Sequence, residues 1–111
     1  MEHPVATKRI AKAIEIEIDP SETKTADSYR FEDLRALKYL ITARPLDGSK
    51  NSAFEALVCK KSSDVSDSIY SKIGDHLNLS TQFLKSGSDM ELRITNGEPE
   101  TLSVSLLRFE T

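Results

Sequence analysis

Few residues in this 111-residue sequence are of the types that perform chemistry. The chain has two histidines, His3 and His76, and a single cysteine, Cys59. One thiol can neither close a disulfide within the chain nor supply the ligands of a cysteine-based zinc site. His76 follows Asp75, but a catalytic pair depends on geometry and not on adjacency in the sequence. We therefore interpret Asp75 and His76 as loop residues and Cys59 as a small buried hydrophobic residue.

Carboxylates are more numerous, and a glycosidase needs two of them facing one sugar ring. Glu15 and Glu17 alternate with isoleucines, which is typical of the solvent side of a strand, and Asp89 and Glu91 lie in a second alternating segment. The sequence contains no glycine-rich phosphate loop, Walker segment or nucleophile elbow. We expect a protein that is not an enzyme, with no catalytic, cofactor-binding or metal-binding residues and no cofactor.

The charge pattern bears on the class of partner. The net charge is −3 and acidic and basic residues are interspersed, whereas nucleic-acid binding needs clustered Lys and Arg. We interpret the densest basic stretch, Lys8, Arg9 and Lys12, as a solvated arm. The first nine residues lack a long apolar run, and eighteen apolar residues never occur together. We expect neither a signal peptide nor a membrane span, and no nucleic-acid or membrane partner.

The first segment that reads as a strand begins near Lys12. Ile14, Ile16 and Ile18 alternate with charged residues, which predicts a strand with one buried face. Pro20 ends this strand, and the polar residues 21–28 are typical of a long surface loop.

The middle of the sequence predicts a hairpin. Residues 34–43 are apolar at many successive positions, which favours a central strand covered on both faces. Residues 53–60 form the returning strand, with Phe54, Ala56 and Val58 on one side, and the turn signal Asp47-Gly48 lies in the connection. Residues 62–76 combine helical spacing of apolar residues with an exposed-strand composition, and we favour a strand at 69–73.

The last third alternates turns and short strands. Strands are predicted at 78–84, 90–95 and 102–109, with turns at 86–89 and 96–100. Together these patterns predict an all-β fold, an antiparallel β-sandwich that is jelly-roll-like, with about seven strands. Residues 1–12 form an N-terminal arm, residues 13–111 form a single domain, and Tyr39, Phe54 and Phe83 are assigned to the core.

Six segments between residues 34 and 109 occur in an informative order. They are Leu-Arg-Ala-Leu-Lys-Tyr-Leu-Ile at 34–41, Glu-Ala-Leu-Val at 55–58, an Asp-rich stretch ending in a tyrosine at 64–70, Leu-Asn-Leu-Ser at 77–80 followed by Phe83, Met-Glu-Leu-Arg-Ile at 90–94, and Val-Ser-Leu-Leu-Arg at 104–108. In this order they resemble the small β-sandwich structural proteins and modules of tailed bacteriophage virions, of the decoration, fibre and baseplate type. That family commonly has His-Asp-Gly where residues 59–64 read Cys-Lys-Lys-Ser-Ser-Asp, and it has no clear counterpart of the Ile-Glu-Ile-Glu-Ile strand.

The resemblance implies a structural role in a virion. We expect a capsid decoration, or cement, protein that binds the major capsid protein or other virion proteins as a homo-oligomer, with a trimer favoured. The implied location is the virion, after synthesis in the host cytoplasm. A tail, neck or baseplate component, or a carbohydrate-binding or host-recognition sandwich, is the alternative. The arm at residues 1–12 and the edge of the first strand are the parts expected to contact neighbouring subunits.

Overall fold

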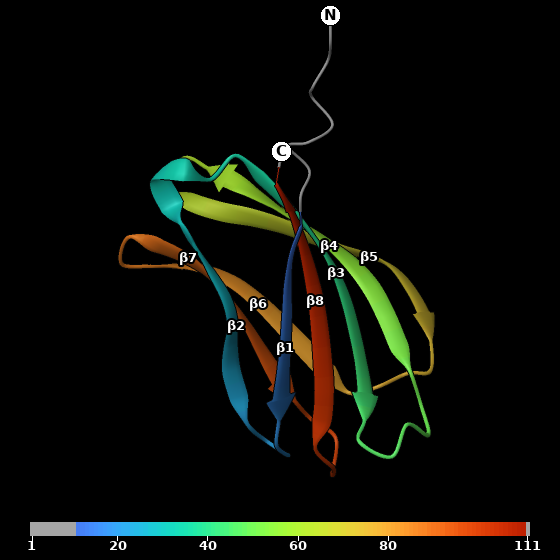
Figure 1. The fold of residues 1–111 in the computed structure, drawn as a ribbon. Helices are drawn as coiled ribbons and strands as arrows, with labels where there is room; N and C mark the ends of the chain where they lie inside the picture. The colour runs from blue at the N-terminus through green and yellow to red at the C-terminus, as the bar shows by residue number, and fades with distance from the viewer. Residues whose placement is uncertain (1–10, 111) are drawn as a thin grey trace, which may run out of the picture.

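The computed structural model describes residues 11–110, which form an antiparallel sandwich of two β-sheets (Figure 1). One sheet has five strands and the other has three, and every pair of neighbouring strands is antiparallel. The all-β sandwich is confirmed, with eight strands instead of about seven. The strands are β1 (Ala11–Ile18), β2 (Thr23–Arg30), β3 (Ala36–Pro45), β4 (Ser52–Lys61), β5 (Asp64–Gly74), β6 (Leu79–Ser86), β7 (Asp89–Asn96) and β8 (Leu102–Glu110).

The strand order is β1-β8-β3-β4-β5 in the larger sheet and β2-β7-β6 in the smaller sheet. The first strand pairs with the last, and the second pairs with the seventh in the opposite layer. This nesting is the jelly-roll-like feature of the fold. The β3–β4 hairpin and β5 continue in the larger sheet, and this continuation makes the two sheets unequal.

β1 has the predicted alternation. Ile14 and Ile16 are half-buried and Ile18 is fully buried, while Glu15 and Glu17 are exposed. β1 begins at Ala11, so Lys12, which the sequence analysis assigned to the arm, belongs to the sheet. The rest of the predicted arm, residues 1–10, lies outside the described residues.

The loop predicted at residues 21–28 is wrong, because β2 occupies Thr23–Arg30. The register of β2 against β7 shifts between Thr25 and Asp27, and this irregularity buries the adjacent residues Ala26 and Asp27 together. The strand therefore lacks the period-two pattern by which sequence analysis recognises strands.

β3 and β4 form the predicted hairpin around residues 46–51. Gly48 has a φ of 71°, a left-handed conformation that favours glycine, and its N–H donates to the Pro45 carbonyl over 3.0 Å. β3 is the central strand of the larger sheet, as expected. It is covered on one face only, because Lys38 is exposed and Leu40 is half-buried while their neighbours are buried.

The segment at 62–76 is a strand, as favoured, but β5 is longer than predicted and starts at Asp64. Its pairing with β4 is interrupted between Ala53 and Glu55, where Ser71 adopts a φ of 56°. This β-bulge adds one residue to β5 and changes the direction of the side chains beyond it.

The core lies between the inner faces of the two sheets. Tyr39, Phe54 and Phe83 are buried there as predicted, and the rings of Tyr39 and Phe83 are 5.6 Å apart. The other buried apolar residues are Ile18, Ala26, Leu34, Leu37, Ile41, Ala43, Ala56, Val58, Leu77, Met90, Leu92, Ile94, Leu102, Val104 and Leu106.

Candidate functional site

A buried polar cluster joins the two sheets on the side formed by β1 and β2. The Tyr39 hydroxyl on β3 donates to Asp27 Oδ2 on β2 over 2.7 Å, and Arg108 Nη1 on β8 donates to the same oxygen over 2.9 Å. Asp27 is 5% exposed and Arg108 is 8% exposed. The carboxylate is therefore shared between a phenol and a guanidinium in a water-poor space, where charge-assisted hydrogen bonds are strong.

The rim of this cluster supplies further partners. Arg108 Nη2 donates to Glu110 over 2.9 Å, and the Tyr29 hydroxyl donates to the other oxygen of Glu110 over 3.3 Å. The Arg108 guanidinium also lies 4.9 Å from the centre of the Tyr29 ring, and Lys12 Nζ is 3.7 Å from Asp27 Oδ1. These contacts leave the charges matched, so the cluster acts as a tie between the sheets.

The titration behaviour of the cluster fits this structural role. Burial raises the pKa of Tyr39 above its ordinary value of 10.0, and the hydrogen bond to Asp27 raises the pKa further. Burial lowers the pKa of Arg108, but Asp27 and Glu110 outweigh that effect and the pKa is raised. The phenol stays protonated and the guanidinium stays charged, so neither group is poised to exchange protons near neutral pH.

This cluster was not predicted from the sequence, although one signal for it is present. Arg108 occupies an inward position on β8, in step with the buried residues Leu102, Val104 and Leu106. An arginine on the apolar side of an alternating strand needs a buried acceptor. Asp27 gave no such signal, because it lies in the polar segment that was interpreted as a loop.

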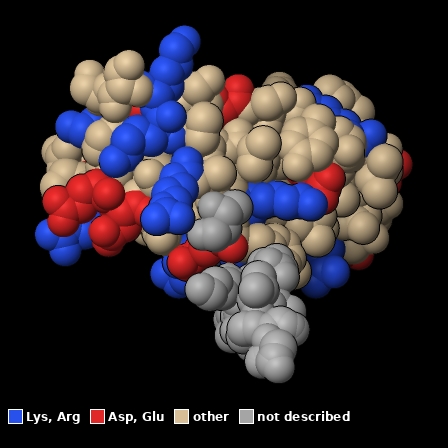
Figure 2. Space-filling model, turned by 90° about the horizontal axis from the view of Figure 1, so that it is seen from above, with Lys and Arg blue, Asp and Glu red and all other residues tan. Residues whose placement is uncertain are grey.

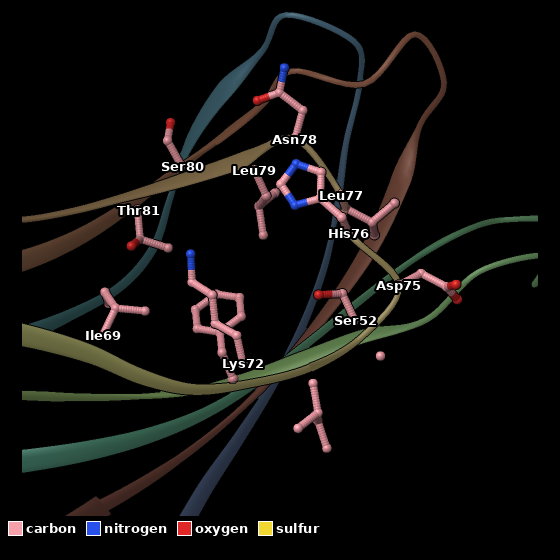
Figure 3. A pocket seen from close by; sticks show the side chains of 13 residues that line it. Ser52, Ile69, Lys72, Asp75, His76, Leu77, Asn78, Leu79, Ser80 and Thr81 are labelled. Atoms are coloured by element: carbon pink, nitrogen blue, oxygen red, sulfur yellow. The ribbon is translucent and has the colours of Figure 1, made fainter.

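A groove of about 430 Å³ lies on the opposite side of the sandwich, between β5 and β6 (Figure 3). Ile69 and Lys72 line it from β5, and Leu79 and Thr81 line it from β6. In Figure 3, Lys72 extends from β5 toward Thr81 across the groove. Among the described residues, the side chains of Lys72 and Thr81 have no hydrogen bond or ion pair, so they are available to a ligand.

The floor of the groove is held in place by backbone contacts. Gly74 has a φ of 87°, and a Cβ atom at this position would lie 2.3 Å from the Asn51 carbonyl oxygen, so only glycine fits. The Asp75 N–H donates to that carbonyl over 2.7 Å, and Asp75 Oδ2 accepts from the Asn51 N–H over 2.9 Å. The connection from β5 to β6 is therefore anchored to the β3–β4 loop.

Asp75 and His76 border this groove but do not form a pair. Asp75 binds the backbone of Asn51, and the two side chains point in different directions in Figure 3. Both residues are exposed, in agreement with their interpretation as loop residues. The arrangement does not orient the imidazole of His76 as a general base.

The outer face of the larger sheet carries an apolar surface, which we call the outer patch. Cross-strand registers place its members in two adjacent rows, with Leu107 beside both Ala13 and Leu40 in one row, and Phe109 and Leu57 on either side of Lys38 in the next. The charges at its centre form an ion pair of 3.3 Å between Lys38 and Glu55. The outer patch consists of Ala13, Leu40, Leu57, Tyr70, Leu107 and Phe109.

The exposure of the outer patch is unusual for a solvent-facing sheet. Leu57 is 44% exposed and Leu107 is 37% exposed, and Ile73 at the margin of the same face is 69% exposed. Cys59 lies on this face and is exposed, so its interpretation as a buried residue is wrong. The cause is strand parity: Val58 points into the core, and the next residue along β4 must point outward.

The carboxylates considered for acid–base chemistry do not converge. Glu15 lies on the outer face of the larger sheet, where it accepts a hydrogen bond from Ser105 over 3.2 Å. Glu91 lies on the outer face of the smaller sheet and pairs with Arg93 over 2.9 Å. Facing outward from opposite layers, they cannot flank one substrate.

The end of the molecule near the 3₁₀ turn Phe31–Asp33 shows charges of both signs side by side (Figure 2). The ammonium groups of Lys60 and Lys85 lie 4.7 Å and 5.1 Å from the centre of the Phe31 ring. Arg30 pairs with Glu32 over 2.8 Å on this surface. Cation–π contacts and ion pairs occupy these side chains.

Within residues 11–110, no group of three or more His, Cys, Asp or Glu side chains is arranged to hold a metal ion. The same residues contain no helix that is long and apolar enough to cross a membrane.

Comparisons with known proteins give matches at the level of structure. No protein-family model matches the sequence, and no curated protein matches it. The tailspike protein of Acinetobacter phage vB_ApiP_P1 is similar in structure, with a TM-score of 0.52 and 12% identity over 93% of this chain and 22% of that chain. The tailspike protein gp49 of Acinetobacter baumannii bacteriophage Fri1, a capsular polysaccharide depolymerase, is similar over 99% of this chain and 19% of that chain, with a TM-score of 0.53 and 17% identity.

These likenesses define the fold of the chain. It spans about a fifth of the length of the solved tailspike chains, so it corresponds to one β-sandwich module within much larger proteins. At this level of identity a common fold does not carry a common activity.

Proposed function

We propose that this chain is a structural β-sandwich module of a tailed-phage virion and that it works by protein–protein contact. Two independent findings support the proposal. Residues 34–109 resemble virion β-sandwich modules in the order of their sequence segments, and nearly the whole chain has the fold of a module found in phage tailspikes.

The outer patch is the single observation that carries the mode of action. Apolar side chains of this size are normally turned inward, and a contiguous exposed group of them marks a contact surface. The patch has the composition of an interface core, since it is rich in leucine and aromatic residues and its central charges, Lys38 and Glu55, neutralise each other. Its proposed occupant is a neighbouring virion protein that presents an apolar sheet face.

The position of the module within the virion is the finer part of the proposal. The tailspike comparison supports a place in the tail apparatus. The capsid decoration role favoured by the sequence resemblance has no support from the fold comparison, and it makes a different prediction about copy number. The proposal assigns the chain a role in contact and not in catalysis.

Quantitative mass spectrometry of purified phage particles tests this proposal. A copy number close to that of the tail proteins is expected. A copy number close to that of the major capsid protein would move the module to the capsid surface, and absence from the particle would refute a virion role.

A matched pair of double variants tests the outer patch. Leu57→Lys with Leu107→Lys should weaken binding to the particle on the order of 100-fold, because each buried leucine contributes about 1.5–3 kcal/mol. Ser28→Lys with Gln82→Lys places the same charges on the outer face of the smaller sheet and should leave binding unchanged. Equal effects of the two pairs would show that the outer patch is not the contact surface.

A further inference from the structure

The smaller sheet of the sandwich has an open edge at β6. Its strand order is β2-β7-β6, so β6 has β7 on one side and no strand of the described chain on the other. An edge strand of this kind presents backbone N–H and C=O groups to whatever lies beside it. The groove of about 430 Å³ lies between this edge and β5, and its volume is within the range of ligand pockets.

The hydrogen bonds of Asn96 on β7 show which groups of β6 face the groove. The Asn96 N–H donates to the Glu22 carbonyl over 3.0 Å and its C=O accepts from the Ser21 N–H over 2.9 Å, so both groups point away from β6. Leu79 is the residue of β6 opposite Asn96. In an antiparallel pair such a residue makes no backbone bond to its partner, and its own N–H and C=O point to the other side. The backbone of Leu79 therefore faces the open edge, and so does that of Thr81, two residues further along.

The next pair along the ladder agrees with this alternation. The Gly97 N–H donates to the Asn78 carbonyl over 2.8 Å, so these two residues form a hydrogen-bonded pair. The same holds for Ser80, whereas the backbone groups of Leu79 and Thr81 have no partner among the described residues. N–H and C=O groups that recur at every second residue match the backbone of an extended chain.

The side chains of the groove indicate what such a chain would carry. Leu79 and Thr81 lie on the inner face of β6, in step with the buried residue Phe83. A residue paired beside them directs its side chain to the same face, toward β5. There Ile69 packs against the core but remains half-buried, so an apolar side chain beside it would remove further apolar surface from water.

Lys72 supplies the unpaired charge of the groove. Its side chain extends from β5 toward Thr81 in Figure 3, and it has no hydrogen bond or ion pair among the described residues. Asp75 is the one acid among the described residues that line the groove, and its Oδ2 accepts from the Asn51 N–H. In Figure 3 Asp75 lies at the other end of the groove from the Lys72 ammonium. The end formed by Lys72 and Thr81 is therefore complementary to an acidic side chain.

We propose that this groove is a docking site for an extended peptide segment of a partner protein, which pairs with β6 as a fourth strand of the smaller sheet. The segment directs an acidic side chain toward Lys72 and an apolar side chain, two positions away, toward Ile69. Main-chain pairing gives the affinity, and the contacts of alternate side chains give the specificity. The site uses the edge of β6 and not the outer patch, so the inference does not rest on the proposed virion role.

A capped synthetic peptide, acetyl-Thr-Val-Thr-Glu-Thr-Val-Thr-amide, is the direct probe. Its valine and glutamate side chains share one face of a strand, and its sequence is the same in both directions, so it fits either strand orientation. The peptide should slow hydrogen exchange of the Leu79 and Thr81 amides. The amides of Ser80 and Gln82, which are bonded to β7, should change little. Hydrogen exchange followed by NMR measures this alternation.

A charge reversal tests the role of Lys72. Lys72→Glu should weaken binding of the peptide about tenfold, because it replaces an attraction by a repulsion. The same variant should bind a peptide with lysine in place of glutamate more tightly than the parent protein does. Lys61→Glu, at the exposed end of β4, changes the net charge equally and should leave binding of both peptides unchanged. Calorimetric titration measures the affinities, and equal thermal unfolding midpoints of the three proteins exclude a loss of fold.

Four results would overturn the inference. They are no binding of the glutamate peptide to the parent protein, equal weakening by Lys72→Glu and Lys61→Glu, binding that leaves exchange of the Leu79 and Thr81 amides unchanged, and NMR shifts of the groove residues with trigalacturonic acid but not with the peptide. The last result would assign the groove to an acidic sugar. None of them bears on the copy number in the particle or on the outer-patch variants, so this inference and the proposed function can fail separately.

Discussion

At the two open sides of the sandwich, the sheets contact each other in different ways. On the side of β1 and β2, Asp27, Tyr39 and Arg108 tie the sheets together, and Asn96 bridges them at the end of β1. On the side of β5 and β6 the sheets part around a groove, where Lys72 and Thr81 have no partner among the described side chains.

This difference separates stability from binding within one small domain. The side of β1 and β2 buries charges that are paired with one another, although Arg108 Nε has no hydrogen-bond partner there. Removing one member of the cluster therefore leaves its partner as an unpaired buried group. The side of β5 and β6 leaves polar and apolar groups available, so a substitution there costs the fold little. Stability should therefore depend on the tied side, and contacts with other molecules should depend on the open side and on the outer patch.

The largest expected effect is that of Asp27→Ala. The variant leaves the guanidinium of Arg108 buried with only the rim residue Glu110 as its acidic partner, and should lower the free energy of unfolding by about 3–5 kcal/mol. Lys72→Ala on the open side should change it by less than about 0.5 kcal/mol. Urea denaturation followed by circular dichroism measures both. Similar losses for the two variants would remove the distinction between the two sides.

A second pair compares two asparagines. Asn96 is fully buried, and its amide donates to the carbonyls of Ile18 and Glu100, each over 2.8 Å. Asn96→Ala should lower the free energy of unfolding by about 1–3 kcal/mol, because it leaves buried backbone acceptors unsatisfied. Asn78→Ala, at an exposed position beside the groove, is the control and should be close to neutral. If Asn78→Ala lowered the free energy of unfolding as much as Asn96→Ala, the two positions would not differ in their contribution to stability.

Tyr39→Phe sharpens the comparison through its dependence on pH. Near neutral pH the substitution should lower the free energy of unfolding by only about 1 kcal/mol, because Asp27 keeps its hydrogen bond to Arg108. The pKa of Tyr39 is raised in the folded state above 10.0, so the unfolded chain loses its proton first. Stability is therefore intact below about pH 10 and falls as the pH rises above it.

The Tyr39→Phe variant has no such group, so the stability gap between the parent and the variant should narrow above about pH 10. Unfolding curves recorded between neutral pH and pH 11 measure this gap. A gap that stays constant over that range would show that Tyr39 titrates in the folded state as it does in the unfolded chain.

The smallest effect concerns Cys59 on the outer face. The thiol is exposed, so a maleimide should label it readily in the isolated protein. If the outer patch contacts a neighbour, labelling in assembled particles should slow several-fold while labelling of the unfolded chain stays fast. Equal labelling rates in the free and assembled protein would place the contact elsewhere.

Strands with one apolar face were predictable from the sequence because alternation records which face is buried. β1, β4, β7 and β8 follow this rule, and for β1 and β4 the residues of the inner face were named from the pattern. β2 escaped detection because its register shift with β7 buries Ala26 and Asp27 in succession. The turn at Gly48 was visible because the sequence of a tight turn reflects a local backbone requirement.

The sequence by itself determined the class of fold, the alternating strands and the core residues Tyr39, Phe54 and Phe83, because these depend on local periodicity and hydrophobicity. Only the tertiary structure decided that Asp27 meets Arg108, which lies 81 positions away, and that Leu40, Leu57 and Leu107 share one exposed face. It also decided that the sheets are unequal and leave a groove beside β6. Strand order and register bring distant residues together, and no pattern within a single strand encodes them.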